Sequence, residues 1–222
     1  MARPMANSAA ARTEILRRIR VATGPASDRA AIEAEWHGIE RGYKQVASID
    51  LDGRLHQLED RLRDYDAGVY RSTRAGIGVL VASILRERGK QAMAVPSDIP
   101  PEWLPAGVRF VEDLRGDVSG VDGCEGVLTS ATLAIAETGT IVLQDAPGQG
   151  RRAVTLLPDY HLCLVDAAKI VQTVPEAIAL LQPTAHLATT FFSGPSATAD
   201  IEMTRIKGVH GPRFVDVILI LD

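Results

Sequence analysis

The chain has 222 residues and a formal net charge of −4, and 46% of its residues are hydrophobic although only 5% are aromatic. This length suits one domain of ordinary size with a substantial, mainly aliphatic core. An acidic chain without a basic stripe lacks the surface that displaces counterions from phosphates, so nucleic-acid binding is not expected.

The two cysteines, Cys124 and Cys163, lie far apart and in no C-x-x-C or Cys/His ligand spacing. The chain therefore cannot hold a cubane iron–sulfur cluster on its own cysteines, and a disulfide scaffold is not expected at this size. The histidines His161, His186 and His210 occur in no metal-ligand spacing such as H-E-x-x-H, so we expect no metal site.

The beginning of the chain has no apolar core of the length found in signal peptides, and no run of about 18 uninterrupted apolar residues occurs anywhere. We therefore expect a cytoplasmic protein without a membrane span.

Residues 1–67 are predicted to form an N-terminal helical region whose first residues, to about residue 11, are disordered. A short amphipathic helix around Ile15 is stopped by Gly24 and Pro25. A second helix, capped by Ser27 or Asp28, is expected to run to Gly42.

A third helix is predicted from leucines at helical spacing, Leu55, Leu58 and Leu62, with charged residues on the opposite side. This helix is either an arm that binds a partner or a packed helix with a solvated outer face. Charged outer faces are the norm for packed amphipathic helices.

Residues 68–222 alternate short apolar strands with helices, which favours an α/β domain with a largely parallel sheet flanked by helices. A helix is expected at 73–88, and Thr173 and Glu176 form a capping-box pattern that opens another. The expected strands are 91–95, 108–111, 153–157, 162–165 and 215–221, with a further short apolar segment ending at Phe192.

The central stretch, residues 130–143, contains two apolar runs that meet at Glu137, Thr138, Gly139 and Thr140. It is predicted to form two short buried strands or a tight hairpin. Glu137 is the best single candidate for an acid, base or nucleophile, because burial between apolar runs would raise its pKa. The alternative is a structural carboxylate that accepts hydrogen bonds from backbone N–H groups at a tight turn.

Four glycine-containing segments are candidates for a common pocket: 137–140, 147–151, 193–196 and 208–213. Ligands of open α/β sheets usually lie at the carboxyl ends of strands, and three of these segments follow strand candidates. The candidate ligand-binding residues are Thr138, Gly139, Thr140, Gly148, Gly150, Arg151, Ser193, Gly194, Ser196, Asp200, His210 and Arg213. Positive charge would come from Arg151, Arg152 or Arg213.

Residues 193–202 are interpreted as a turn from a strand into a helix, with Ser196 or Thr198 as N-cap. The exposed N–H groups of the first helical turn could hold a phosphate or a carboxylate, although Asp200 and Glu202 would compete with an anion there. Capping and anion binding both remain open for this segment, which is neither a P-loop nor a G-x-G-x-x-G motif.

Several of these segments form an ordered set of motifs: 134–140, 147–151, 156–158 followed by His161, 193–202 and 208–212. Together they resemble the LUD domain family, and more narrowly its lactate utilisation protein C branch. The resemblance covers roughly residues 68–222 and implies a fold similar to the sugar-phosphate isomerase and coenzyme A transferase-like α/β group. Residues 137–139 also resemble, over three positions only, the turn that supplies the glutamate nucleophile in coenzyme A transferases.

The resemblance further implies a bacterial system that oxidises L-lactate to pyruvate, in which two partner subunits carry the iron–sulfur clusters and this chain carries no cofactor. In such a system the chain would contribute a ligand-binding or assembly role. Arg151 or Arg213 would hold the carboxylate, and Glu137 would act on the hydroxyl proton. The alternatives are a stand-alone transferase or isomerase acting on an acyl thioester or sugar phosphate, and a scaffold without chemistry. Whether this polypeptide is itself catalytic stays open.

Overall fold

The structure is a computed structural model that describes residues 8–24, 28–113, 119–199, 205–207 and 211–222. The chain divides into two compact units, Met1–Tyr43 and Lys44–Asp222. The first unit contains α1 (Ser8–Thr23) and α2 (Arg29–Gly38). The side chain of Asp28 caps α2 by accepting a hydrogen bond from the backbone N–H of Ala30, as expected, but the helix ends at Gly38 and not at Gly42. The helix α1 begins inside the stretch that was expected to be disordered.

The second unit is built on a six-stranded sheet in which all neighbouring strands are parallel, so the predicted α/β domain is confirmed. In spatial order the strands are β1 (Gly68–Ser72), β12 (Phe214–Ile220), β7 (Tyr160–Asp166), β4 (Gly126–Ser130), β2 (Ala92–Val95) and β3 (Arg109–Glu112).

A second sheet of four strands contains the central stretch of the sequence. Its spatial order is β8 (Ile170–Val171), β5 (Leu133–Ile135), β6 (Thr140–Gln144) and β9 (Thr189–Phe192). The antiparallel pair β5–β6 is the predicted hairpin. A separate two-stranded ribbon pairs β10 (Ala197–Ala199) with β11 (Arg205–Lys207).

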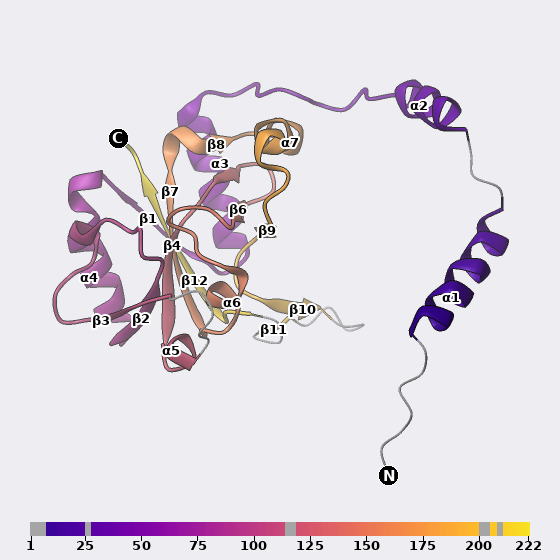
Figure 1. Ribbon diagram of the computed structural model, residues 1–222. Coiled ribbons are helices and arrows are strands. Elements are labelled where there is room, and N and C mark those ends of the chain that lie inside the picture. Colours follow the sequence, from indigo (N-terminus) through magenta and orange to yellow (C-terminus); the bar gives the residue numbers. More distant parts are fainter. Residues whose placement is uncertain (1–7, 25–27, 114–118, 200–204, 208–210) are drawn as a thin grey trace, which may run out of the picture. The chain divides into compact units, whose positions relative to one another are not determined.

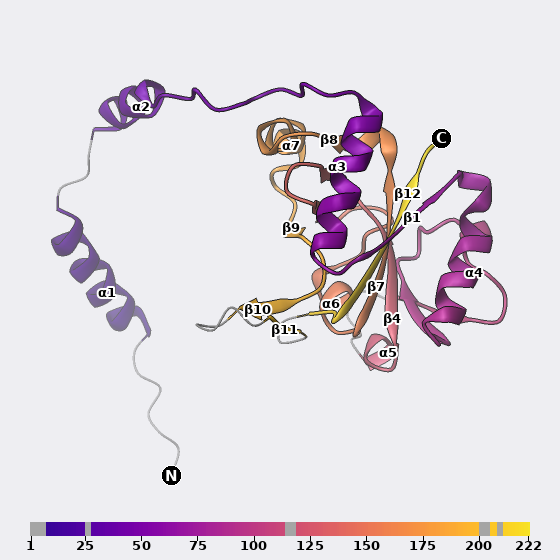
Figure 2. The same ribbon diagram turned by 180° about the vertical axis from the view of Figure 1, so that it is seen from behind.

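The helices and the two sheets form layers (Figures 1 and 2). The helix α4 (Ile77–Glu87) packs on one face of the large sheet, and α3 (Leu51–Asp64) packs on the other face together with the small sheet. The helix α7 (Val174–Leu181) covers the outer face of the small sheet. Short helical segments connect these layers: η1 (Arg74–Gly76), η2 (Pro101–Trp103), α5 (Ser119–Asp122), α6 (Arg152–Leu156), η3 (Ala167–Lys169) and η4 (Gln182–Thr184).

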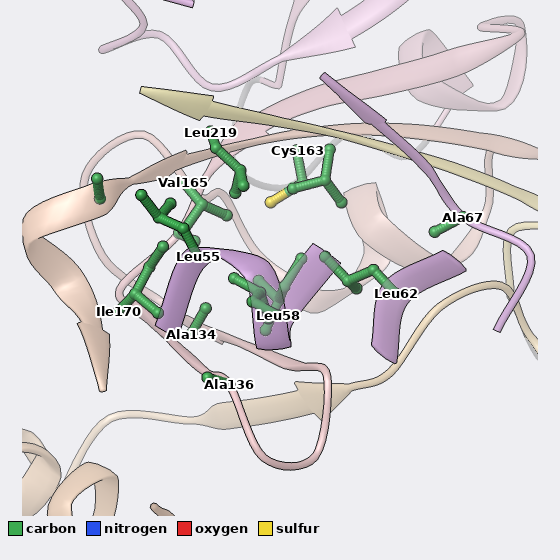
Figure 3. Packing of buried hydrophobic residues seen from close by; sticks show 14 of the residues in the cluster. Leu55, Leu58, Leu62, Ala67, Ala134, Ala136, Cys163, Val165, Ile170 and Leu219 are labelled. Atoms are coloured by element: carbon green, nitrogen blue, oxygen red, sulfur yellow. The ribbon is translucent and has the colours of Figure 1, made fainter. Parts of the chain in front are cut away.

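The main core lies where α3 contacts both sheets (Figure 3). Leu55, Leu58 and Leu62 face Cys163, Val165 and Leu219 of the large sheet and the alanines of the hairpin. Each leucine of α3 is almost fully buried, which stabilises the fold by roughly 1.5–3 kcal/mol per side chain. The packed-helix interpretation of this segment is therefore confirmed.

Period-two burial explains why the hairpin has no polar face. Ala134 and Ile141 point to the main core, whereas Leu133, Ile135 and Val142 point to α7. A strand that is covered on both faces reads as a continuous apolar run, as this one does.

Two local predictions are wrong. Residues 153–157, expected as a strand, lie mostly in the helix α6. The turn at Ser193–Ser196 leads into the strand β10 and not into a helix, so its residues do not form a helix N-terminus. The capping box at Thr173 and Glu176, in contrast, is present as predicted.

Candidate functional site

A cavity of about 280 Å³ lies between the two sheets, and we call it the inter-sheet cavity. The large sheet contributes His161 and Val215, which stand second in β7 and β12. The small sheet contributes Phe192 and the turn that follows it, and α6 contributes Arg152. The inter-sheet cavity therefore lies at the amino ends of parallel strands, and not at the carboxyl ends where the sequence placed the site.

His161 is the most deeply buried polar side chain of this cavity, with 2% of its surface exposed. Its ring contacts that of Phe192 at 5.3 Å between centroids, and its Nε2 atom lies 2.8 Å from the hydroxyl of Thr129. Burial, and to a smaller extent the positive charge of Arg152, lowers the pKa of His161 to about 4. The imidazole is therefore neutral near pH 7.

Behind His161 a chain of hydrogen bonds runs between β4 and β7. The hydroxyl of Thr129 donates to Sγ of Cys163 at 3.7 Å, and Cys163 donates to the backbone oxygen of Ser130 at 3.9 Å. Burial raises the pKa of Cys163 to about 12, so it keeps its proton.

Arg152 is the first residue of α6 and lines the cavity with an exposed side chain. Within the described part of the chain it makes no ion pair or hydrogen bond through its guanidinium. Its positive charge contributes to the lowered pKa of the His161 ring.

The structure brings two of the predicted segments together, the hairpin turn and the Ser193 turn. The hydroxyls of Thr138 and Thr140 lie 2.7 Å apart, and those of Thr140 and Ser193 lie 2.8 Å apart. This row of three hydroxyls leads from the cavity, which Ser193 lines, to the exposed residue Thr138.

Both turns also rest against α3 through glycines with positive φ. Gly139 has φ 62°, and a Cβ atom there would lie 2.6 Å from Cβ of Arg61. Gly194 has φ 74°, and its Cβ atom would clash with Tyr65. These positions need glycine for both conformation and space.

The Ser193 turn also meets the described end of the fourth segment. The backbone N–H of Ser196 donates to the oxygen of Pro212 at 2.8 Å, and Gly194, Ser196, Gly211 and Pro212 all line the cavity. Two further candidates of the sequence analysis, Asp200 and His210, lie outside the described residues.

Glu137 points to a different part of the second unit. Its carboxylate accepts hydrogen bonds from Lys44 Nζ at 2.6 Å and from Gln172 Nε2 at 3.3 Å, and its side chain is 34% exposed. It does not line the inter-sheet cavity. Glu137 is therefore not the buried acid that the sequence suggested, and its catalytic role stays a prediction.

Gln172 beside it also fixes the chain that enters α3. Its Oε1 atom accepts hydrogen bonds from the backbone N–H groups of Ser48 and Ile49, at 2.6 and 3.3 Å. The surroundings of Glu137 thus hold the segment before α3 in place.

The two arginines that the sequence assigned to a carboxylate ligand are both paired within the protein. Arg151 donates to Asp113 at 2.8–3.0 Å, and the side chain of Asp113 is only 4% exposed. Arg213 donates to Asp159 at 2.5 and 2.9 Å and lowers the pKa of that carboxyl.

The segment with Gly148 and Gly150 lies at the carboxyl ends of the strands of the large sheet. Gly150 and Arg151 line a smaller cavity of about 160 Å³ together with Pro96 and Asp113, which follow β2 and β3. Gly148, with φ 75°, packs against Ser130 at the end of β4. The segment 147–151 therefore does not line the inter-sheet cavity, although Gly150 also borders an adjoining cavity that Arg152 lines.

Among the described residues no three His, Cys, Asp or Glu side chains are grouped as a metal site would require. His161 is buried and His186 is exposed. None of the described helices combines the length and the apolar character that a membrane span requires.

The comparisons with known proteins identify this architecture. Residues 112–220 match the LUD domain. A crystal structure of a DUF162 family protein from Deinococcus radiodurans superposes with a TM-score of 0.67 and 33% sequence identity, covering 78% of this chain and 99% of that one. The second unit is thus a LUD-type α/β domain.

Two curated relatives place the chain within this class. Lactate utilization protein C of Deinococcus radiodurans is 40% identical over 181 residues, which are 80% of this chain and 84% of the relative. Lactate utilization protein C of an Exiguobacterium species is 39% identical over 101 residues, which are 43% of this chain and 44% of the relative. The chain belongs to the LUD domain family, in its lactate utilization protein C branch.

Proposed function

We propose that the chain is the non-iron–sulfur subunit of a bacterial system that oxidises L-lactate to pyruvate. The observation that carries this proposal is the similarity over most of its length to a protein named for lactate utilization. The inter-sheet cavity, with an arginine that no carboxylate neutralises among the described residues, gives the subunit a place for a small acid.

In this proposal the electrons of the oxidation pass to iron–sulfur clusters in two partner subunits, while the present chain acts by binding the ligand or by holding the complex together. The sequence supports this division, because the two cysteines cannot supply the ligands of a cubane cluster. Cys124 and Cys163 are also both buried in the fold. The cytoplasm is the compartment that the sequence favours.

The experiment that tests the proposed function is growth on L-lactate as sole carbon source after deletion of the gene. We expect growth on L-lactate to be lost, growth on pyruvate to be kept, and the wild-type gene to restore growth. An affinity-tagged chain should copurify with two proteins that show iron–sulfur absorption. Unimpaired growth of the deletion strain on L-lactate would reject the proposal.

The role of Glu137 is tested in the same strain. If the carboxylate moves the hydroxyl proton of lactate, Glu137→Gln abolishes growth on L-lactate although the protein accumulates normally. If it only pairs with Lys44, both Glu137→Gln and Lys44→Gln restore growth, because exposed ion pairs stabilise proteins by about 1 kcal/mol or less.

A stand-alone transferase or isomerase is the second candidate from the sequence. Its anion site was expected at a helix N-terminus after Ser193, and that helix is replaced by the strand β10. Calorimetry with coenzyme A and sugar phosphates tests this candidate directly, and we expect no binding by the purified chain.

A further inference from the structure

We infer that the inter-sheet cavity binds a small 2-hydroxy monocarboxylate, with the carboxylate on Arg152 and the hydroxyl donating a hydrogen bond to Nδ1 of His161. The choice of L-lactate as this acid rests on the proposed function. The charge of the site and its preference for a hydroxyl donor rest on the structure alone.

The charge argument begins with the three arginines at or near the segments that the sequence selected. Arg151 and Arg213 each face a carboxylate of the protein, whereas Arg152 has no such partner among the residues described. Arg152 also stands in the first turn of α6, where peptide dipoles disfavour a cation. Local structure therefore gives no reason for a positive charge here, and a guanidinium at the wall of a cavity fits a carboxylate in a bidentate pair.

The hydrogen-bond polarity follows from the chain behind His161. We assign the tautomer of His161 from this network: with the hydroxyl of Thr129 donating to Cys163, it accepts from Nε2 across 2.8 Å. Neutral imidazole has only one N–H group. Nδ1 is left with a lone pair, and it makes no hydrogen bond with any residue that the structure describes.

A lone pair of this kind distinguishes the two members of the lactate and pyruvate couple. The hydroxyl of a 2-hydroxy acid can donate to Nδ1, whereas the carbonyl oxygen of a 2-keto acid would oppose one lone pair with another. The site therefore favours lactate over pyruvate, and it also favours lactate over propionate, which has no oxygen at that position.

The size of the cavity agrees with a small acid. A volume of about 280 Å³ admits a small acid and lies just below the range of about 300–1,000 Å³ typical of drug-sized ligands. An adjoining cavity shares Arg152 and Thr155 with this one, but Oε1 of Gln149 and the amide of Gln144 in its wall already hydrogen-bond within the protein. His161 lines the inter-sheet cavity and not the adjoining one, whereas Arg152 borders both.

Isothermal titration of the purified full chain with L-lactate, D-lactate, pyruvate and propionate tests the inference. We expect L-lactate to bind more tightly than pyruvate or propionate. Arg152→Gln should weaken the binding of all the carboxylates by at least about tenfold, because a charge-assisted bidentate pair is lost. Arg86→Gln is the matched control, since it removes an exposed arginine on α4, and it should bind like the wild type.

Thr129→Val tests the orientation of His161 separately from the charge. It removes the partner that holds the proton on Nε2, so the preference for L-lactate over pyruvate should shrink while binding of propionate is kept. His161→Phe should also remove the preference for lactate over propionate. The comparison of L-lactate with pyruvate in the wild type and the loss in Arg152→Gln need no substitution in the core.

Binding of L-lactate that is equal in Arg152→Gln and the wild type would overturn the inference, as would tighter binding of pyruvate or no binding of any acid at millimolar concentration. The growth experiment tests the proposed function independently of the binding experiment. If the chain binds L-lactate but is dispensable for growth on it, the binding site is supported and the proposed function is rejected. If the chain is required for growth but binds no carboxylate, the proposed function is supported and the binding site is rejected.

Discussion

At the scale of single residues, His161 makes the stability of the fold depend on pH. Its pKa is lowered to about 4 in the folded state from 6.5, so between these values the unfolded chain binds more protons than the folded one. The stabilising effect of the neutral ring is complete above pH 6.5 and is lost as the pH falls toward 4, by up to about 3 kcal/mol. Urea unfolding at neutral pH and near pH 5 measures this loss of stability.

We expect His161→Phe to lose less stability than the wild type over the same change in pH, because the ring that must stay neutral is gone. His186→Phe is the matched control, since His186 is exposed, and it should keep the wild-type dependence. An unchanged dependence in His161→Phe would show that other groups cause it.

A second residue-scale prediction concerns Asp216, which is fully buried on β12 between β1 and β7. It accepts hydrogen bonds from Arg88 at 2.6 and 2.8 Å and from the hydroxyl of Tyr160 at 2.9 Å. Arg88→Met leaves this carboxylate without its cation and should lower the free energy of unfolding by about 3–5 kcal/mol.

Chemical denaturation measures this change, and Arg86→Met, in the last turn of α4 just before Arg88, should alter stability by less than about 0.5 kcal/mol. Equal effects of the two substitutions would mean that Asp216 does not depend on Arg88.

At the scale of elements, the contact between the hairpin and α3 requires a glycine. Gly139→Ala would force a side chain into positive φ and against Arg61, so we expect a loss of about 2–4 kcal/mol. Gly89→Ala is the control, because Gly89 has φ 65° but nothing within 4 Å of the added Cβ, and it should cost only about 1–2 kcal/mol. The difference in unfolding free energy between the two variants isolates the contact with α3.

The elements that the sequence predicted well are those whose pattern is local. The leucines of α3, the capping box of α7 and the hairpin around Gly139 each carry a period or a turn residue that one structure satisfies. The segment 153–157 has neither, since Ala153, Val154 and Leu156 fit a strand and a short helix equally well. In the helix, Val154 packs beside Val127 and Cys124, a tertiary contact that the local sequence does not reveal.

At the scale of the whole molecule, the first unit has no buried core of its own among its described residues. No residue of α2 is buried, and Ile15, Ile19, Ile32 and Trp36 are each at least half exposed. Helices without tertiary packing are marginal in water, so we expect a peptide of residues 1–43 to show little helix on its own. Circular dichroism of this peptide checks the expectation, and a strongly helical spectrum would contradict it.

Sequence reasoning placed the candidate site less well than the fold, for a reason at the same scale. Ligands bind beyond the carboxyl ends of strands that share one parallel sheet. The strands β5, β6, β8 and β9 form a sheet of their own in which β6 and β9 are antiparallel, so the loops that follow these two strands lie at opposite ends of that sheet. Arg152 and His161 were named in the sequence analysis, but only the structure shows that they line one cavity.

The inter-sheet cavity lies at the amino ends of β7 and β12, whereas the ion pair of Arg151 and Asp113 lies at the carboxyl ends of the strands of the large sheet. Arg151 and Arg152 are consecutive in the sequence, yet Arg151 pairs with Asp113 after β3 and Arg152 lines the inter-sheet cavity. A change in the length of the segment before α6 would therefore disturb the ion pair and the cavity wall together.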